Sequence, residues 1–375
     1  MTGNGETAWE TYRREGLKRA AGLGNRGPLH FDEDGVLTQD ILDAYRRTGF
    51  YVFTGVLSPE ECRELERELD QVLDNAPLVN DGEVDRHGRP SRFSRHYSVE
   101  PPWSSQEDQD EDSEAEGAPG IVRMLSHPLM IMDSALRAYG HPDILKMIAS
   151  VNGPDFVPFS ESVFHKAAYQ GFPTRWHQDG RTHWAEDGTP LEQPDGSGKT
   201  HGVNLSVSWS HCTPENGLWV IPGSHRRWRL ADGGEFPPIT EWLPDAVPMT
   251  LQPGDCGLVN RSSMHGSYPN RSAVRRVNMI MGFHNRASAI GTEATNVHAF
   301  ARMGDKRKTV RYTEEHVLRR ARMIPLAIDA RRQRYPDEVP YEYRGSYIGG
   351  GEWNAEARAE ISQDGDEYWQ RNMTL

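Results

Sequence analysis

The sequence is poor in cysteine and has no long apolar run. Its three cysteines, Cys62, Cys212 and Cys256, lack the paired spacing of a disulfide framework or a zinc knuckle, so we interpret them as small buried apolar residues. No apolar run approaches the ~18 residues of a membrane span. The segment after Met1 also lacks the basic and then apolar parts of a signal sequence. These absences predict a cytoplasmic protein without a membrane partner.

The sequence also has fewer basic than acidic side chains. The 375 residues include 42 Lys and Arg against 55 Asp and Glu, a formal net charge of -13. Because binding to phosphate backbones requires a positive surface, this balance argues against nucleic acid as a general partner. One local exception is the compact basic turn Arg226-Arg227-Trp228-Arg229. It is a candidate contact for an anionic substrate, and ordinary solvated arginines are the alternative.

Three parts are visible along the chain. Residues 1–38 form a polar N-terminal lead, residues 39–290 form one domain, and residues 291–375 form a C-terminal extension. Within the domain, residues 98–119 or so are too acidic and too poor in apolar side chains to be buried, which predicts a mobile insertion. For the extension, covering the core, contacting a second copy of the chain and closing over a substrate are open alternatives.

End signals and apolar spacing predict the main elements of the domain. Ser58, followed by Pro59 and two acids, is typical of a helix N-terminus. Alternating apolar residues are typical of strands. The sequence predicts helices over residues 38–49, 58–73, 130–151 and 313–322, and strands over residues 50–53, 156–168 and 203–209.

Many short strands with Gly and Pro turns, set after supporting helices, predict the fold class. We expect a mainly β protein with flanking helices, a double-stranded β-helix or cupin-like jelly roll whose two sheets enclose a site. The mouth of such a fold suits a small or medium ligand. In the predicted strand over residues 203–209, Asn204, Ser206 and Ser208 share one face and are candidates to line that cavity.

His177 and Asp179 are the first residues that indicate chemistry. On an extended segment, side chains two apart project to the same side, so both can reach one ion. His265, far downstream, completes a possible triad. Two imidazoles and one carboxylate suggest non-haem Fe(II), with coordination positions left open for a co-substrate and O2. A solvated or hydrogen-bonded histidine is the alternative, because a His followed two positions later by an acid also arises by chance.

Arg276 lies eleven positions after His265, at the start of an apolar strand pattern. Its planar guanidinium can bind one carboxylate of a dicarboxylate co-substrate while the other end of that molecule chelates iron. Alternation places Arg275 on the opposite face, so only one of the two arginines can serve. An ordinary surface charge is the alternative for Arg276.

These residues form part of a longer pattern. Trp176-His177-Gln178-Asp179, the run from Glu215 to His225, and His265-Gly266-Ser267 followed by Asn270, Ser272 and Arg276 occur in this order after the opening segment from Tyr45 to Ser58. Together they resemble the phytanoyl-CoA dioxygenase family of Fe(II)/2-oxoglutarate-dependent oxygenases, over about residues 40 to 285.

The resemblance implies roles for individual residues. His177, Asp179 and His265 match the iron ligands, which makes residues 39–290 the oxygenase domain. Arg276 matches the arginine that holds the distal carboxylate of 2-oxoglutarate, and Ser267 matches a hydroxyl that assists it. Lys166 resembles a lysine often found on the strand before the His-x-Asp motif, which makes it a third candidate to bind 2-oxoglutarate. A solubilising lysine at a strand edge is the alternative. No catalytic residue beyond the metal centre is expected.

The loop after Asp179 is locally similar to the ectoine hydroxylase branch of the family. Here the order is His183-Trp184, and Arg181 stands where that branch has an acid, which argues against ectoine itself as the substrate. An aromatic wall with an arginine suits a polar or carboxylate-bearing metabolite. Core packing is the alternative for the tryptophans. The candidate substrate residues are Arg181, His183, Trp184, Asn204 and Trp219.

The resemblance implies Fe(II) as cofactor, 2-oxoglutarate and O2 as co-substrates, and hydroxylation of an unactivated C–H bond of a small molecule with release of succinate and CO2. Halogenases of this superfamily replace the carboxylate ligand by a small residue, so Asp179 favours other outcomes. Desaturation, cyclisation and epoxidation by the same oxidant stay open. A non-oxidative metal isomerase or hydrolase and a silent binding protein are further alternatives on the same fold.

Overall fold

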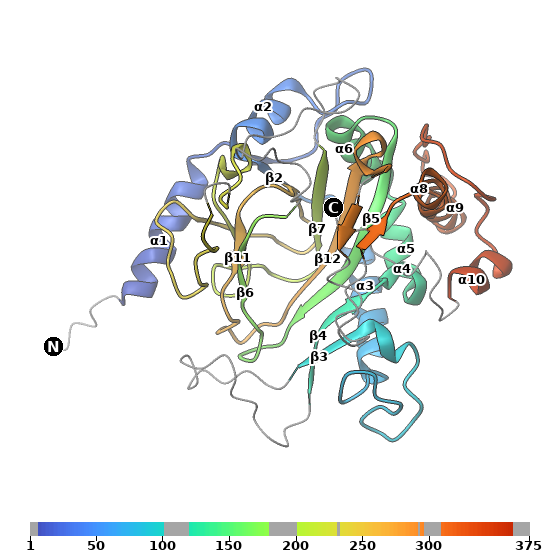
Figure 1. Cartoon of the computed structure of the whole chain (residues 1–375), viewed down its shortest axis with the longest axis horizontal. Coiled ribbons are helices and arrows are strands. Elements are labelled where there is room, and N and C mark those ends of the chain that lie inside the picture. The colour runs from blue at the N-terminus through green and yellow to red at the C-terminus, as the bar shows by residue number, and fades with distance from the viewer. Residues whose placement is uncertain are drawn as a thin grey trace.

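The protein is described by a computed structural model that covers residues 7–100, 120–179, 201–230, 233–291, 293–295 and 309–362. Most of the predicted acidic insertion at about residues 98–119 lies outside the described residues. The described strands form an eight-stranded sheet, a four-stranded sheet and a two-stranded ribbon. Figure 1 shows the two larger sheets side by side, with helices on the far side of the larger one.

The large sheet has the order β1-β2-β10-β7-β12-β5-β4-β3. The small sheet has the order β6-β11-β8-β9, and the ribbon pairs β13 with β14. The strands of the large sheet are β1 (Arg26–Gly27), β2 (Phe50–Phe53), β3 (Tyr97–Glu100), β4 (Ile121–Ser126), β5 (Phe156–Lys166), β7 (Gly202–Ser208), β10 (Cys256–Asn260) and β12 (Arg276–Asn285). The remaining strands are β6 (Thr174–His177), β8 (Leu218–Val220), β9 (Val247–Met249), β11 (His265–Ser267), β13 (Glu293–Thr295) and β14 (Thr309–Arg311).

This arrangement is the predicted double-stranded β-helix, and β12 shows how the sequence produces it. Val277, Met279 and Met281 alternate along the strand and are buried in the main core. That core lies between one face of the large sheet and the helices. Arg276 and Asn278 alternate with the apolar residues and therefore project from the opposite face, toward the inside of the jelly roll.

Among the helices that cover the large sheet, the one that begins at Pro59 starts where the sequence signals place it. Ser58 and Glu61 form a capping box with the first turn of the helix that begins at Pro59. The predicted helix over residues 130–151 is instead three shorter ones, because the chain becomes extended at Met132 and again at His141, the residue before Pro142. A Cβ atom at Gly140 would lie 2.2 Å from the carbonyl oxygen of Ala327, so glycine permits a close helix contact there. These helices are α2 (Gln39–Thr48), α3 (Pro59–Asp74), α4 (Pro128–Ile131), α5 (Asp133–Tyr139) and α6 (Pro142–Asn152), with the 3-10 turns η1 (Ser94–His96) and η3 (Ser224–Arg226) elsewhere in the chain.

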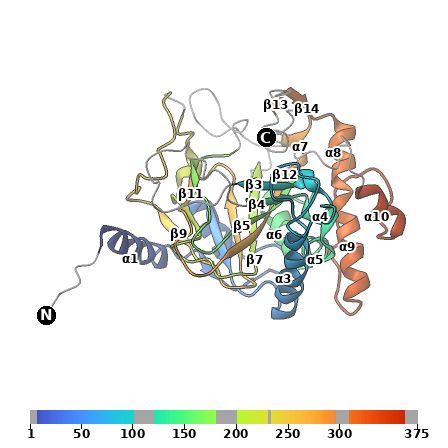
Figure 2. The same ribbon diagram turned by 90° about the horizontal axis from the view of Figure 1, so that it is seen from below.

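The polar N-terminal lead contains a helix that the sequence pattern did not predict, α1 (Ala8–Ala21). A capping box between Thr7 and Glu10 begins it. The helix packs on β9, and its Trp9 and Tyr12 join an aromatic cluster behind the small sheet. Figures 1 and 2 place α1 at the opposite side of the molecule from the C-terminal helices.

The described part of the C-terminal extension packs on the core, which is one of the three alternatives that the sequence left open. Its helices α8 (Glu314–Ala321) and α9 (Met323–Arg334) contact β5 and α5 respectively. Arg320 of α8 forms a fully buried ion pair with Glu161 of β5. Two shorter helices are α7 (Arg286–Ala289) and α10 (Ala355–Ile361). Across the described ranges, every helix is too short or too polar to span a bilayer.

Candidate metal centre

His177 and His265 stand directly opposite each other on the antiparallel strands β6 and β11. Opposite residues of such a pair project to the same face, and the two ring centroids are 4.2 Å apart. Asp179 follows two residues after the end of β6. Its Oδ1 is 3.6 Å from Nε2 of His177 and its Oδ2 is 4.0 Å from Nε2 of His265. One ligand atom from each of the three residues lies within 4.8 Å of the others, as a shared metal ion requires.

Backbone carbonyls orient both imidazoles. Nδ1 of His177 lies 2.7 Å from the carbonyl oxygen of Arg175, and Nδ1 of His265 lies 2.9 Å from that of Ser263. Each Nδ1–H donates to its carbonyl, so each Nε2 keeps its lone pair for a metal. Burial, and then the neighbouring His177, lower the pKa of His265 to about 4. The His265 ring is therefore neutral at physiological pH and able to act as a ligand.

Asp179 is held from two sides. The side-chain amide of Asn204 on β7 donates to its Oδ2 at 3.0 Å. The Asp179 amide donates to the carbonyl oxygen of Arg261 at 3.0 Å. Asn204 was predicted to line the substrate cavity, and in the structure it bonds the candidate carboxylate ligand. The strand pattern identified the correct face of β7 but not this contact.

Gln178, between the two ligands, points the other way. Its Nε2 donates to the carbonyl oxygens of Ser224, Arg227 and Ser262, and its Oε1 accepts from the amide of Arg229. It thereby ties the basic turn of residues 226–229 to the strand that carries His177. The arginines of that turn are exposed. The alternation of side chains along an extended segment predicts this opposite orientation. It does not predict the hydrogen-bond partners, because they are distant in sequence.

Arg276 and Lys166 lie directly opposite each other on β12 and β5. Both are buried, with 6% and 5% of their surface exposed. Lys166 Nζ donates to Ser267 Oγ at 2.7 Å and to the carbonyl oxygen of Tyr268 at 2.6 Å. Arg276 Nη1 donates to the carbonyl oxygen of Asn216 at 3.3 Å. The structure thus brings together all three residues that the family resemblance assigned to 2-oxoglutarate.

This cation pocket fits an anion. Within the described ranges, neither Lys166 nor Arg276 pairs with an acidic side chain, and Arg276 Nε is buried without a hydrogen-bond acceptor. Burial lowers the pKa of both groups, and for Lys166 the positive charge of Arg276 adds to this effect. Keeping both groups charged without a counter-ion is unfavourable, and a bound carboxylate would favour the protonated form of Lys166 beside Arg276.

Arg275, the rival of Arg276, points to the other face of the sheet. Its guanidinium pairs with Glu66 and Asp70 of α3. Alternation along β12 therefore distinguishes the two arginines as expected. The cation pocket also contains a residue without a sequence signal, Cys212, whose Sγ lies 3.3 Å from Asn278 Oδ1. Burial raises the pKa of this thiol, so it is neutral.

The predicted substrate residues were not all placed near the metal triad by the structure. Arg181, His183 and Trp184 lie outside the described residues. Trp219 is fully buried in the aromatic cluster, stacked on Tyr12 at 4.8 Å between ring centroids. It pairs with Gly266, the neighbour of His265, so its side chain projects away from the metal triad. Trp219 is therefore a packing residue and does not line the cavity.

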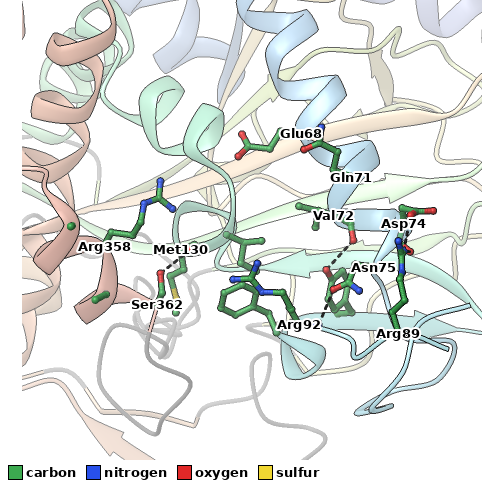
Figure 3. Close-up of a pocket in the computed structure, with 15 residues that line it drawn as sticks. Glu68, Gln71, Val72, Asp74, Asn75, Arg89, Arg92, Met130, Arg358 and Ser362 are labelled. Atoms are coloured by element: carbon green, nitrogen blue, oxygen red, sulfur yellow. Dashed lines mark hydrogen bonds and ion pairs between the residues drawn. The ribbon is translucent and has the colours of Figure 1, made fainter. Parts of the chain in front are cut away.

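A cavity of about 790 Å³ lies elsewhere, between α3, α4 and α10 (Figure 3). Its charged groups serve the fold. Arg89 pairs with Asp74 and Asp85, Arg358 pairs with Asp133, and Glu68 accepts from backbone amides at the start of α5. It contains none of the metal-triad or cation-pocket residues, so we do not regard it as the reaction site.

Comparisons with known proteins find a family and several similar proteins. The family described as Phytanoyl-CoA dioxygenase (PhyH) matches residues 45–278, a segment that includes the triad and the cation pocket. An ectoine dioxygenase of Nocardia farcinica is 24% identical over 288 residues, which cover 71% of this chain and 82% of that protein. The dioxygenase cdmD of Talaromyces verruculosus is 37% identical over 83 residues, 22% of this chain and 25% of that protein. The crystal structure of EctD from S. alaskensis with bound Fe has 19% identity and a TM-score of 0.47, over 69% of this chain and 82% of that chain.

Proposed function

The chain belongs to the phytanoyl-CoA dioxygenase family of Fe(II)- and 2-oxoglutarate-dependent oxygenases, and on that premise we propose that it hydroxylates an unactivated C–H bond of a small-molecule metabolite. The observation that carries this proposal is the pairing of two sites inside one jelly roll. A His-Asp-His triad lies on and just beyond the small sheet, and a buried Lys-Arg pair without a described acidic partner lies in the large sheet.

Each group has a specific task in this proposal. His177, Asp179 and His265 would hold iron through three protein ligands and leave the remaining positions open. Arg276, Lys166 and Ser267 would receive the distal carboxylate of 2-oxoglutarate and so orient the molecule. Bound iron with 2-oxoglutarate and O2 supplies an oxidant that removes hydrogen from carbon, with release of succinate and CO2. The protein chain would position the bound molecules and exclude water from the site.

The inner face of the large sheet supports a substrate whose reacting part is largely neutral. Ile280, Asn278 and Gly282 of β12 share the face of Arg276, and they stand opposite Ser162, Phe164 and Ser160 of β5 respectively. Apart from Gly282, which has no side chain, these residues offer apolar surface, hydroxyl groups and the amide of Asn278, but no charge. The loop differences at Arg181, His183 and Trp184 further favour a metabolite other than ectoine.

The test is succinate formation by purified protein supplied with Fe(II), 2-oxoglutarate and O2, first without and then with candidate metabolites. We expect slow uncoupled succinate formation, which a true substrate accelerates while gaining one oxygen atom. Gain of a double bond or a ring instead of oxygen would replace hydroxylation by desaturation or cyclisation. Product formation without O2 consumption would support a metal isomerase or hydrolase and contradict the proposal.

A further inference from the structure

Arg261 places a buried guanidinium beside the candidate carboxylate ligand. The residue directly follows β10, and 7% of its side chain is exposed. Its Nε lies 4.0 Å from Asp179 Oδ2. Its backbone carbonyl accepts the Asp179 amide. Arg261 therefore contacts the ligand segment through both its main chain and its side chain, four residues before His265.

Two further residues lock this guanidinium in place. Nη1 of Arg261 lies 2.8 Å from Nε2 of His284, which accepts the hydrogen bond. The guanidinium carbon lies 4.0 Å from the ring centroid of Phe159, within the range of a cation–π contact. The His284 ring meets the same Phe159 ring edge to face, at 4.8 Å. The three side chains thus form one packed unit, which we call the Arg261 clamp.

A glycine on the neighbouring strand leaves space for the Arg261 clamp. Gly202 stands opposite His284 on the neighbouring strand. A Cβ atom at Gly202 would lie 2.6 Å from Cε1 of His284, so a larger residue would displace the imidazole. His284 is fully buried, so its displacement would require the neighbouring side chains to repack. A side chain at residue 202 would therefore displace the acceptor that fixes Arg261.

We propose that Arg261 is a positioning residue for the metal site: together with Asn204 it restrains the Oδ2 side of Asp179, so that the carboxylate binds the metal through one oxygen and an adjacent coordination position stays open. The inference rests on the proposed function, since it concerns the same site. Asn204 supplies a direct hydrogen bond to Oδ2, and Arg261 supplies a fixed positive charge on the same side. Residues that hold ligating side chains in this way influence metal affinity and coordination geometry.

The side-chain chemistry favours arginine over lysine for this task. A guanidinium is planar, so it can lie against Phe159 while its edge donates to His284. An ammonium group keeps the charge but has no flat face and no rigid fork. Lysine at residue 261 would therefore retain the attraction to Asp179 but lose the fixed orientation.

The test is Co(II) binding to metal-free protein, followed by calorimetry and by the visible d–d spectrum, which reports ligand number and geometry. We expect Arg261→Gln to weaken Co(II) binding by about 10- to 100-fold and to alter the spectrum. Arg261→Lys should recover part of the affinity but keep the altered spectrum. The matched control is Arg275→Gln, because Arg275 lies on the outer face of β12, bonded to α3, and this variant should bind Co(II) as the wild type does.

A second variant distinguishes a local effect on the metal site from a simple folding defect. His284→Phe keeps the aromatic contact with Phe159 but removes the acceptor for Arg261, and it should change the spectrum in the same direction as Arg261→Gln. Because the two residues act as one unit, the double variant should be no weaker than Arg261→Gln alone. Wild-type affinity and spectrum in folded Arg261→Gln would overturn the inference and leave the proposed function intact. Failure of the wild type to bind Co(II) would instead overturn both.

Discussion

Arg276 lies directly opposite Lys166 across two neighbouring strands, and no described carboxylate neutralises either charge. Buried cations of this kind are normally paired, because removing a charge from water is costly. The pocket is therefore preorganised for an anion that the chain itself does not supply. This relationship connects the fold to the use of a dicarboxylate co-substrate.

The first prediction concerns pH. Burial, then Arg276 and Arg123, lower the pKa of Lys166 in the free protein. A bound carboxylate would raise that pKa again, so 2-oxoglutarate binding should take up a proton at any pH between the two values. The affinity for 2-oxoglutarate should then increase as the pH falls, and level off below the pKa of the free protein.

Calorimetry of 2-oxoglutarate binding to Co(II)-loaded protein, in buffers of different ionisation enthalpy, measures this proton uptake. Lys166→Met removes the titrating amine and should abolish the dependence on buffer. Equal uptake in the wild type and in Lys166→Met would assign the proton to another group and refute the prediction.

Arg276→Gln should weaken binding of 2-oxoglutarate to the metal-loaded protein by at least about 30-fold, since loss of one partner of a buried charge pair costs ~2 kcal/mol or more. Metal affinity should not change, because Arg276 is not a proposed ligand. Arg275→Gln is the matched control, because its guanidinium pairs with Glu66 and Asp70 outside the site. Comparable losses in both variants would argue against a specific carboxylate contact.

Asp179→Ala should abolish Fe(II)-dependent succinate formation, because it removes one of the three proposed ligands. Asp143→Ala provides a control, since Asp143 bonds only Lys146 and the start of its own helix among the groups described for it. Iron content and succinate can be measured on the same samples. Full activity in Asp179→Ala would refute the ligand assignment.

Gly16→Ala tests the packing of α1 on the small sheet. Alanine in a helix is favoured over glycine by about 1 kcal/mol. Here, however, the added Cβ would lie 2.7 Å from the fully buried Trp219 ring, and overpacking costs about 1–3 kcal/mol. We expect net destabilisation in urea unfolding.

Gly22→Ala, at the end of the same helix, meets its nearest atom at 3.5 Å and should not destabilise the protein comparably. Stabilisation by Gly16→Ala would show that α1 shifts freely on the sheet. That result would contradict close packing of α1 against the aromatic cluster behind the small sheet.

The sequence predicted those features that follow from local periodicity. The opposite faces of Arg275 and Arg276 follow from strand alternation, and the structure agrees. His177 and Asp179 also project to one side, although β6 ends at His177 and Asp179 lies beyond it. The capped start of α3 was equally predictable. By contrast, one predicted helix is three. The chain becomes extended at Met132 and at His141, and a close contact between Gly140 and α9 accompanies the second break.

Contacts between distant segments carried no such signal. Asn204 lies on the predicted face of its strand, yet its bond to Asp179 depends on the distance between the two sheets. The Arg261 clamp joins three residues from separate strands and strand ends. Trp219 and Tyr12 are more than two hundred positions apart and stack only because α1 packs behind the small sheet. Such contacts require the tertiary structure.

The most direct test of the central claim is an anaerobic titration of metal-free protein with Fe(II) and then with 2-oxoglutarate. The triad and the cation pocket together predict a weak visible charge-transfer band, typical of an iron-bound 2-oxo acid, in the wild type. They also predict its loss in Arg276→Ala at the same 2-oxoglutarate concentration. Bound iron with no band in the wild type would contradict the account.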